Sequence, residues 1–337
     1  MNDQDLNNTI NKYISEHLSP TPKQRDYITQ KYEELKGFLK GSCFQSGSYA
    51  RFTAHNPVHD LDVIHRVSDG SIQENPSAVI DTLFSTMKDG YDNSTITKVK
   101  KLYKQSHSVT VEFADSLDDF SIDVVPAIEL TEEQNEFNQP LYLVPEILRL
   151  NKYNRQRRYE EASENPIQWI KSDPGGYIKA AFELNELNSD FRHTAKLLKS
   201  WRHACKIAYA DSFCFKSFHL EQIIYEHFAT NGGVLTLNAS VECLGAVSDC
   251  LSKPKFLDRA DPTRYIDEYI TELTSQQKQL ILRIQVGAYE IIRKLPGCQS
   301  EDEVINCMGK LLLINKHSSS NFIRSTQIVT PRQPWSY

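Results

Sequence analysis

The chain has 337 residues, enough for roughly two domains of about 150 residues each. With 39% hydrophobic residues, 24% charged residues and a mean hydropathy of -0.49, it has the composition of a globular protein. We expect no membrane partner, because no apolar run approaches the roughly 20 residues of a membrane span and the polar N-terminus does not resemble a signal peptide. The formal net charge of -6 argues against nucleic acid as a constitutive partner.

Seven cysteines are present, but no two of them are spaced as C-x-x-C, and the ten histidines form no H-E-x-x-H motif. A disulfide framework and a structural zinc site are therefore not expected. Free thiols in a reducing compartment are the simplest interpretation, so we expect a cytoplasmic protein.

Residues 3–40 have the apolar spacing of two helices. For the second helix, Thr21 is the expected N-cap, Pro22 the first helical residue and Gly41 the stop. From residue 42 to about 126 the pattern changes to short alternating runs, which predict a small mixed sheet with one helix between its strands. The expected strands are at 43–46, 59–67, 94–105, 107–113 and 118–130, and the helix is at 75–90.

From about residue 160 the apolar spacing becomes helical again and predicts helices as far as residue 315. The predicted architecture is an α/β lobe packed against a helical lobe. Its expected parts are bridging N-terminal helices at 1–41, the α/β lobe at 42–160, the helical lobe at 161–315 and a mobile tail at 316–337.

Three aspartates interrupt strands that otherwise have the pattern of buried ones. Asp60 and Asp62 are two residues apart on one run, so their side chains point to the same face, and Asp123 has the same polar-on-apolar position on a later run. An isolated D-x-D is more often the solvated face of an edge strand. If the two strands are neighbours, however, the three carboxylates converge on a site for Mg²⁺ or Mn²⁺, with two ions that could clamp a phosphoryl transfer.

A glycine and a serine precede this strand. Gly47 would allow a sharp turn and a close approach of phosphate, and Ser48 would add a hydroxyl donor at the start of a short helix. A lone Gly-Ser pair carries no information. The ordered set of strand, Gly-Ser, short helix, D-x-D and later Asp is far more specific.

This set resembles the DNA polymerase β-like nucleotidyltransferases. Within that superfamily the chain is similar to the bacterial CD-NTases, the cyclic-oligonucleotide synthases of anti-phage signalling, which resemble cyclic GMP-AMP synthase and oligoadenylate synthase in fold. The segments that carry the resemblance are FQSGSYARFTAHNPVHDLDVI (44–64), FSIDVVPA (120–127), PIQWIKSDPGGY (166–177), AKLLKSWRHACK (195–206), KSFHLEQII (216–224) and LDRADPT (257–263). It implies an α+β fold in which a polymerase β-like nucleotidyltransferase lobe, a mixed sheet with flanking helices, meets a helical lobe at an active-site cleft.

The resemblance also implies roles for individual residues. Asp60, Asp62 and Asp123 would be the catalytic residues and metal ligands, with Asp123 also orienting or deprotonating the attacking ribose hydroxyl. Gly47 and Ser48 would hold the nucleotide phosphates. The implied further contacts to the donor triphosphate are Lys199 and Ser217.

Simpler interpretations stand beside several of these roles. Lys199 could be a solvated helix lysine, and Ser217 could be a helix N-cap ahead of Glu221. Trp169 fits a core or interface residue better than a base-stacking one, and the basic stretch at 149–158 fits a solvated loop better than a nucleic-acid contact. One departure from the family pattern is Phe52, because members often have glycine before the following threonine.

The expected function is the joining of NTPs into a cyclic di- or oligonucleotide second messenger, with two Mg²⁺ or Mn²⁺ ions per site and release of pyrophosphate. A separate effector would respond to the product, and a regulatory protein partner is left open. Two alternatives remain. The chain could be a nucleotidyltransferase that acts on RNA or protein, by linear synthesis, tailing or AMP transfer, or it could be a non-catalytic nucleotide-binding protein.

Overall fold

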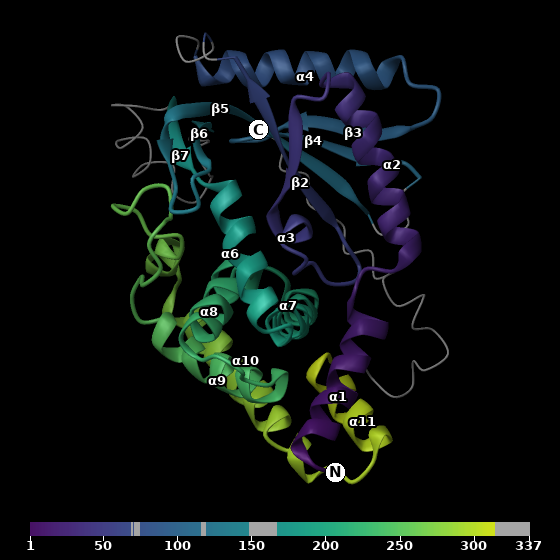
Figure 1. Ribbon diagram of the computed structural model, residues 1–337, viewed down its shortest axis with the longest axis vertical. Coiled ribbons are helices and arrows are strands. Elements are labelled where there is room, and N and C mark those ends of the chain that lie inside the picture. Colours follow the sequence, from purple (N-terminus) through teal and green to yellow (C-terminus); the bar gives the residue numbers. More distant parts are fainter. Residues whose placement is uncertain (69, 71–74, 116–118, 148–166, 314–337) are drawn as a thin grey trace.

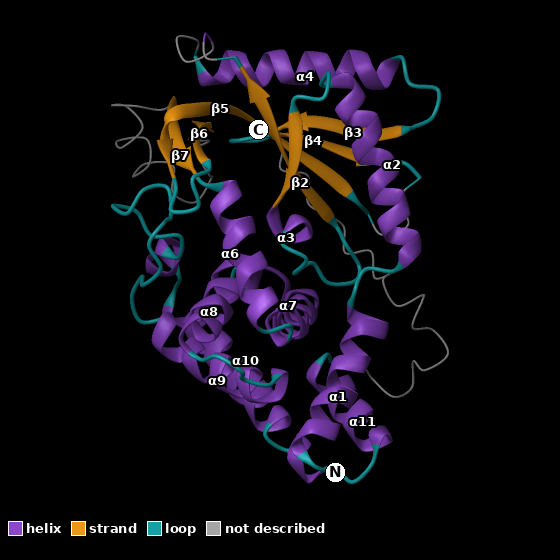
Figure 2. Cartoon of the chain, in the orientation of Figure 1, coloured by secondary structure: helices purple, strands orange, loops and turns teal. Residues whose placement is uncertain are grey.

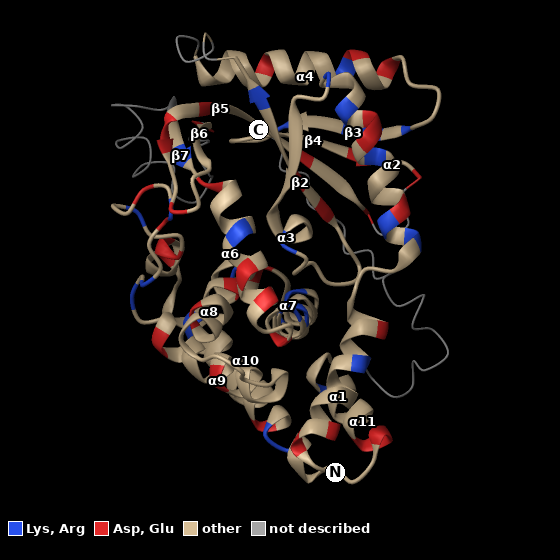
Figure 3. Cartoon of the chain, in the orientation of Figure 1, with Lys and Arg blue, Asp and Glu red and all other residues tan. Residues whose placement is uncertain are grey.

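The computed structural model describes residues 1–68, 70, 75–115, 119–147 and 167–313. It has the expected mixed α+β architecture, with a sheet at one end and a group of helices at the other (Figures 1 and 2). Acidic and basic residues are interspersed along the described elements (Figure 3). None of the helices in these ranges is both long and apolar enough to cross a bilayer.

The described strands form one mixed sheet of seven, with the order β1-β2-β5-β4-β3 and with β6 and β7 continuing from β5. Strand β5 is central: its first half pairs with β4, its second half with β6, and its other edge with β2 in parallel. The strand bounds are β1 Cys43–Ser46, β2 Asp60–Val67, β3 Val99–Lys104, β4 Val109–Phe113, β5 Ser121–Gln134, β6 Pro140–Ile147 and β7 Ile167–Ser172.

Two helices, α2 (Pro22–Phe38) and α4 (Pro76–Asp92), cover one face of the sheet. The alternation expected from the sequence is confirmed, because Leu61 and Val63 of β2 are fully buried in the core that these helices close. The intervening residues of β2, including both of its aspartates, consequently face away from this core.

The second core lies among the helices that follow the sheet. It is built from α6 (Pro174–Leu187), α7 (Asp190–Tyr209), α8 (Ser217–Thr230), α9 (Thr236–Cys250), α10 (Ser275–Ile292) and α11 (Glu301–Leu311). Trp201, Phe213 and Phe215 are among its most completely buried side chains.

The N-terminal helices divide between the two cores. Helix α1 (Asp3–Tyr13) and the π-helical turn after it pack into the helical core, whereas α2 packs on the sheet. Thr21 caps α2 in a capping box with Gln24, and Pro22 is its first residue, as predicted.

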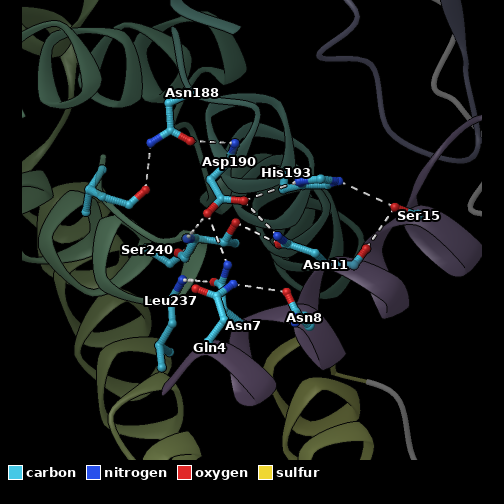
Figure 4. A network of polar contacts seen from close by, with 12 residues as sticks. Gln4, Asn7, Asn8, Asn11, Ser15, Asn188, Asp190, His193, Leu237 and Ser240 are labelled. Carbon is cyan, nitrogen blue, oxygen red and sulfur yellow. Dashed lines mark hydrogen bonds and ion pairs between the residues drawn. The ribbon is translucent and has the colours of Figure 1, made fainter. Parts of the chain in front are cut away.

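A buried carboxylate ties α1 to the helical core. Asp190, at the start of α7, accepts hydrogen bonds from the side chains of Asn7 (3.0 Å) and Asn11 (2.7 Å), and the backbone N–H of Thr236 in α9 also points to it (3.3 Å). Figure 4 shows that His193 lies beside the same carboxylate oxygen as Asn11 and reaches Ser15. This network joins three helices that are distant in sequence.

One part of the helical prediction is wrong. Residues 167–172 form strand β7, which pairs with β6 and extends the sheet, instead of continuing the helical pattern. The segment IQWIKS is too short to show a helical period and carries isoleucines and a tryptophan that suit a strand. The predicted mobile tail at 316–337 lies outside the described residues, as does most of the basic stretch at 149–158.

Candidate active site

The three aspartates lie on the face of the sheet that α2 and α4 leave uncovered. Strands β2 and β5 are parallel neighbours, as the convergence of the aspartates required, and their register places Asp62 directly beside Asp123. Asp60 is two residues before Asp62 on the same face and is exposed. The backbone of the sheet therefore gathers the three carboxylates at one place.

Their environment favours a bound cation. Burial, with the neighbouring charges of Asp60 and Asp123, raises the pKa of Asp62 to about 6. Burial also raises the pKa of Asp123, and Asp60 adds to this effect, although hydrogen bonds from Thr110 and Gln105 oppose it. Like charges on adjacent strands repel each other, so an ion with oxygen affinity would relieve the repulsion.

The three carboxylates are not arranged as a complete metal-binding site in this structure. Asp123 Oδ1 is already engaged by the Thr110 hydroxyl and the Gln105 amide. Within the described part of the chain, no three or more Asp, Glu, His or Cys side chains are oriented as a ready-made metal site. The donor type suits Mg²⁺ or Mn²⁺, and metal binding at these residues remains a prediction.

The Gly-Ser turn forms as expected. Gly47 has a φ of +65° and begins the short helix α3 (Gly47–Ala50), directly after β1. A Cβ atom at this position would lie 1.7 Å from Oδ2 of Asp62, so the turn is in close contact with the central carboxylate. Glycine is therefore required both for the backbone conformation and for the space.

A pocket of about 480 Å³ opens where these elements meet the helices. One wall comes from the sheet side and contains Gly47, Ser48, Asp60 and Asp62, and the opposite wall comes from α7 and α8. The residues of the second wall are Lys199, Arg202, His203, Ser217, Phe218 and Glu221. The structure thus brings six of the seven predicted site residues around one pocket, and Asp123 stands behind Asp62 on the next strand.

Lys199 is not a solvated lysine. Its side chain is 4% exposed, and its ammonium group is 2.7 Å from Oε2 of Glu221. Arg51, which follows α3, donates from Nε to the other oxygen of Glu221 at 2.5 Å. Burial alone would raise the pKa of Glu221, but the two cations lower it well below its ordinary value.

The interpretation of Ser217 as a helix N-cap is wrong. Lys216 occupies the N-cap position of α8, and no side chain caps this end of the helix. Ser217 is the first helical residue and lines the pocket.

The sequence did not single out a group of three histidines in the same pocket. His203 on α7 has its ring 5.0 Å from those of both His55 and His59, which lie in the loop before β2. Burial, with repulsion from neighbouring cationic groups, lowers the pKa of His55 to about 3 and that of His203 to about 4. These two rings are therefore neutral at pH 7, and no spacing rule linked residues so far apart in sequence.

The structure also places Phe52 and Trp169, two residues that the sequence analysis discussed. Phe52, noted above as a departure from the resembled family's pattern, has a φ of +59°, is 60% exposed and lies under the guanidinium of Arg192. Trp169 is a partly buried residue of β7, opposite Pro145 of β6, and is not among the pocket residues.

Comparison with known proteins identifies the fold and the domain. Residues 5–140 match the model of the Second Messenger Oligonucleotide or Dinucleotide Synthetase domain. The chain is similar in structure to Escherichia coli MS115-1 CdnC with ATP, at 15% identity and a TM-score of 0.67, over 91% of this chain and 97% of that one. No curated protein sequence is close enough to count as a relative.

Two other solved structures have the same fold. Bradyrhizobium diazoefficiens CdnG, a CD-NTase in complex with GTP, is 13% identical with a TM-score of 0.62, over 91% of this chain and 98% of that one. Vibrio cholerae DncV, a cyclic AMP-GMP synthase, is 11% identical with a TM-score of 0.64, over 92% and 96% of the two chains. The resemblance inferred from the sequence is confirmed for the domain and for the fold: residues 5–140 match the model of the Second Messenger Oligonucleotide or Dinucleotide Synthetase domain, and the chain has the fold of the bacterial CD-NTases.

Proposed function

We propose that the protein is a metal-dependent nucleotidyltransferase that joins NTPs into a cyclic di- or oligonucleotide second messenger and releases pyrophosphate. The observation that carries the proposal is the pocket itself. Strand carboxylates and a glycine turn form one wall, and a buried lysine reaches the pocket from the other. The domain match supports the class of product.

The proposed metal ligands are Asp60, Asp62 and Asp123. Their hard oxygen donors suit Mg²⁺ or Mn²⁺. Burial, together with the charges of Asp60 and Asp123, raises the pKa of Asp62, and bound cations would offset both effects. When bound, two ions would stabilise the charge that develops on the attacking and leaving oxygens.

The chain's own residues would bind and orient the substrates. The absence of a side chain at Gly47 lets a phosphate approach the backbone, and the Ser48 hydroxyl can donate to it. Lys199 and Ser217, on the opposite wall, would contact the same triphosphate. Asp123, whose pKa is raised, would accept the proton of the attacking ribose hydroxyl.

Two transfers in one pocket would make a cyclic product, with the linear intermediate turning round before ring closure. We propose that the product activates a separate effector in anti-phage defence. A regulatory protein partner is compatible with this role.

The test uses the purified protein with each α-labelled NTP, alone and in mixtures, in the presence of Mg²⁺ or Mn²⁺. Products are treated with phosphatase and separated. The Asp60→Asn/Asp62→Asn double variant is the inactive counterpart. Asp89→Asn, an exposed acid on α4, is the matched control and should behave as the wild type.

A labelled small product that resists phosphatase and requires Asp60 and Asp62 is the expected result. A product that phosphatase trims would instead indicate linear oligonucleotide synthesis. Labelling of added RNA or protein, with no small product, would favour the macromolecular acceptors. The absence of every product, with nucleotide binding retained, would favour a non-catalytic binding protein.

A further inference from the structure

Glu221 is a buried acid in the pocket with no role in the proposed chemistry so far. It lies on α8, one turn after Ser217, and its side chain is 3% exposed. Its Oε1 accepts from Arg51 Nε at 2.5 Å and from the Thr53 hydroxyl at 2.9 Å, and its Oε2 accepts from Lys199 Nζ at 2.7 Å. Both carboxylate oxygens are thus engaged, so in this arrangement Glu221 is neither a metal ligand nor a general base.

The charges around Glu221 come from both sides of the pocket. Arg51 directly follows α3, the helix that begins at Gly47, on the sheet side, and Lys199 is on α7. One carboxylate therefore holds two cations, and all three side chains line the pocket that also contains Asp60 and Asp62. The excess positive charge is available to an anion such as a triphosphate.

Lys199 depends on this carboxylate for its own charge. Burial lowers the pKa of Lys199, the Glu221 carboxylate opposes this effect, and the Arg51 guanidinium adds to it. Asp60 favours the charged form of Lys199. Two other titratable groups also face Lys199, Asp62 from β2 and His55 from the preceding loop, and the ammonium lowers the pKa of each. Without the charge of Glu221, the ammonium would be buried beside a guanidinium, with only the strand aspartates to favour its charged form.

We propose that Glu221 is a positioning residue that keeps Lys199 protonated and aims it, together with Arg51, at the triphosphate of the bound NTP. The inference rests on the proposed function for the identity of the anion. It extends that function by explaining how Arg51, from the sheet side of the pocket, and Lys199, from α7, are directed at one triphosphate.

The test measures binding of inorganic tripolyphosphate, which needs neither turnover nor knowledge of the base. Affinity is measured by calorimetry from pH 5.5 to 9 for the wild type and for Glu221→Gln, and the ratio of the two is taken at each pH because the probe itself titrates. Glu221→Asp keeps the charge on a shorter side chain. Glu226→Gln, an exposed acid on the same helix, is the matched control.

We expect Glu221→Gln to bind about ten-fold more weakly than the wild type at pH 8. The deficit should shrink as the pH falls, because acid restores the proton on Lys199. Glu221→Asp should bind with a ratio to wild type that does not change with pH, and Glu226→Gln should match the wild type. With NTPs as substrates, Glu221→Gln should raise KM more than it lowers kcat.

A purely structural role predicts a different pattern. If Glu221→Gln weakens binding by the same factor at every pH, or binds as the wild type, the inference is overturned. If that variant does not fold, Glu221→Asp decides: its shorter side chain should shift Lys199 and weaken binding, and binding equal to that of the wild type would overturn the inference. If tripolyphosphate binding shows the expected pH-dependent difference between the wild type and Glu221→Gln, but the wild type makes no nucleotide product, the proposed function is contradicted and the role of Glu221 still holds.

Discussion

Gly47 and Asp62 fit together only because residue 47 has no side chain. A Cβ atom there would lie 1.7 Å from Oδ2 of Asp62, and the φ of +65° disfavours any L-residue at the same point. The Gly47 turn and the central carboxylate are consequently held in one fixed relation, although they are 15 positions apart in the chain and belong to different elements.

Gly47→Ala should therefore abolish most of the activity. The new methyl group would displace Asp62 or the turn by about 1 Å, and a misplacement of that size costs about 100-fold in rate. Steady-state NTP turnover measures the loss. Gly37→Ala, at an exposed position of α2 with no atom near the added Cβ, is the control and should keep full activity. An active Gly47→Ala variant would show that the contact is not needed.

Asp62→Asn should be inactive but more stable than the wild type in the presence of a chelator. The pKa of Asp62 is raised to about 6, so at pH 7 the charged form is held in an unfavourable place. Removal of the charge should increase the free energy of unfolding by about 1–2 kcal/mol, measured by urea denaturation.

This gain should depend on pH in a defined direction. Above about pH 6 the folded wild type carries the full cost of the Asp62 charge, and as the pH falls toward about 4 the carboxyl is protonated and the cost disappears. The advantage of Asp62→Asn should fade over the same window. A variant that is less stable than the wild type at pH 7 would contradict the argument.

Protons and metal ions should compete for Asp62. Activity should fall as the pH decreases through about 6, because protonation removes a proposed metal ligand. The midpoint should move to lower pH when the Mg²⁺ concentration is raised. Turnover measured against pH at several Mg²⁺ concentrations checks this. If the pH of half-maximal activity does not change with the Mg²⁺ concentration, Asp62 is not a metal ligand.

Asp190→Ala should loosen α1. The substitution removes the acceptor for Asn7, Asn11 and the N–H of Thr236, and leaves these buried groups unpaired. We expect a loss of about 2–4 kcal/mol in the free energy of unfolding, with faster amide hydrogen exchange in α1 than elsewhere. Asp249→Ala, at an exposed position of α9, is the control. Unchanged exchange in α1 would mean that apolar packing alone holds the helix.

Phe52→Gly should be tolerated better than Phe52→Ala. Position 52 has a φ of +59°, which costs about 1 kcal/mol for a residue with a side chain, and glycine avoids that cost. Both variants lose the contact with Arg192, so the comparison isolates the backbone. Urea denaturation should rank Gly above Ala by about 0.5–1 kcal/mol. The reverse order would mean that the turn readjusts.

Local patterns were sufficient for much of the fold. The alternation around Leu61 and Val63 predicted which face of β2 is buried, and the Thr21-Pro22 pair predicted the start of α2. Both depend on the periods of strands and helices and on caps, which involve residues only a few positions apart. The same locality explains the error at 167–172, where a short apolar segment has no distinctive period.

The sequence by itself determined the chemistry of the site: three carboxylates on strand faces, and a glycine turn ahead of them. Only the tertiary structure decided that β5 runs beside β2, so that Asp62 meets Asp123. It also decided that Glu221 pairs with Arg51, 170 residues away, and that His203 lies against the loop before β2. These pairings depend on how the two cores pack against each other, and that packing is set by many weak long-range contacts with no signature in any short segment.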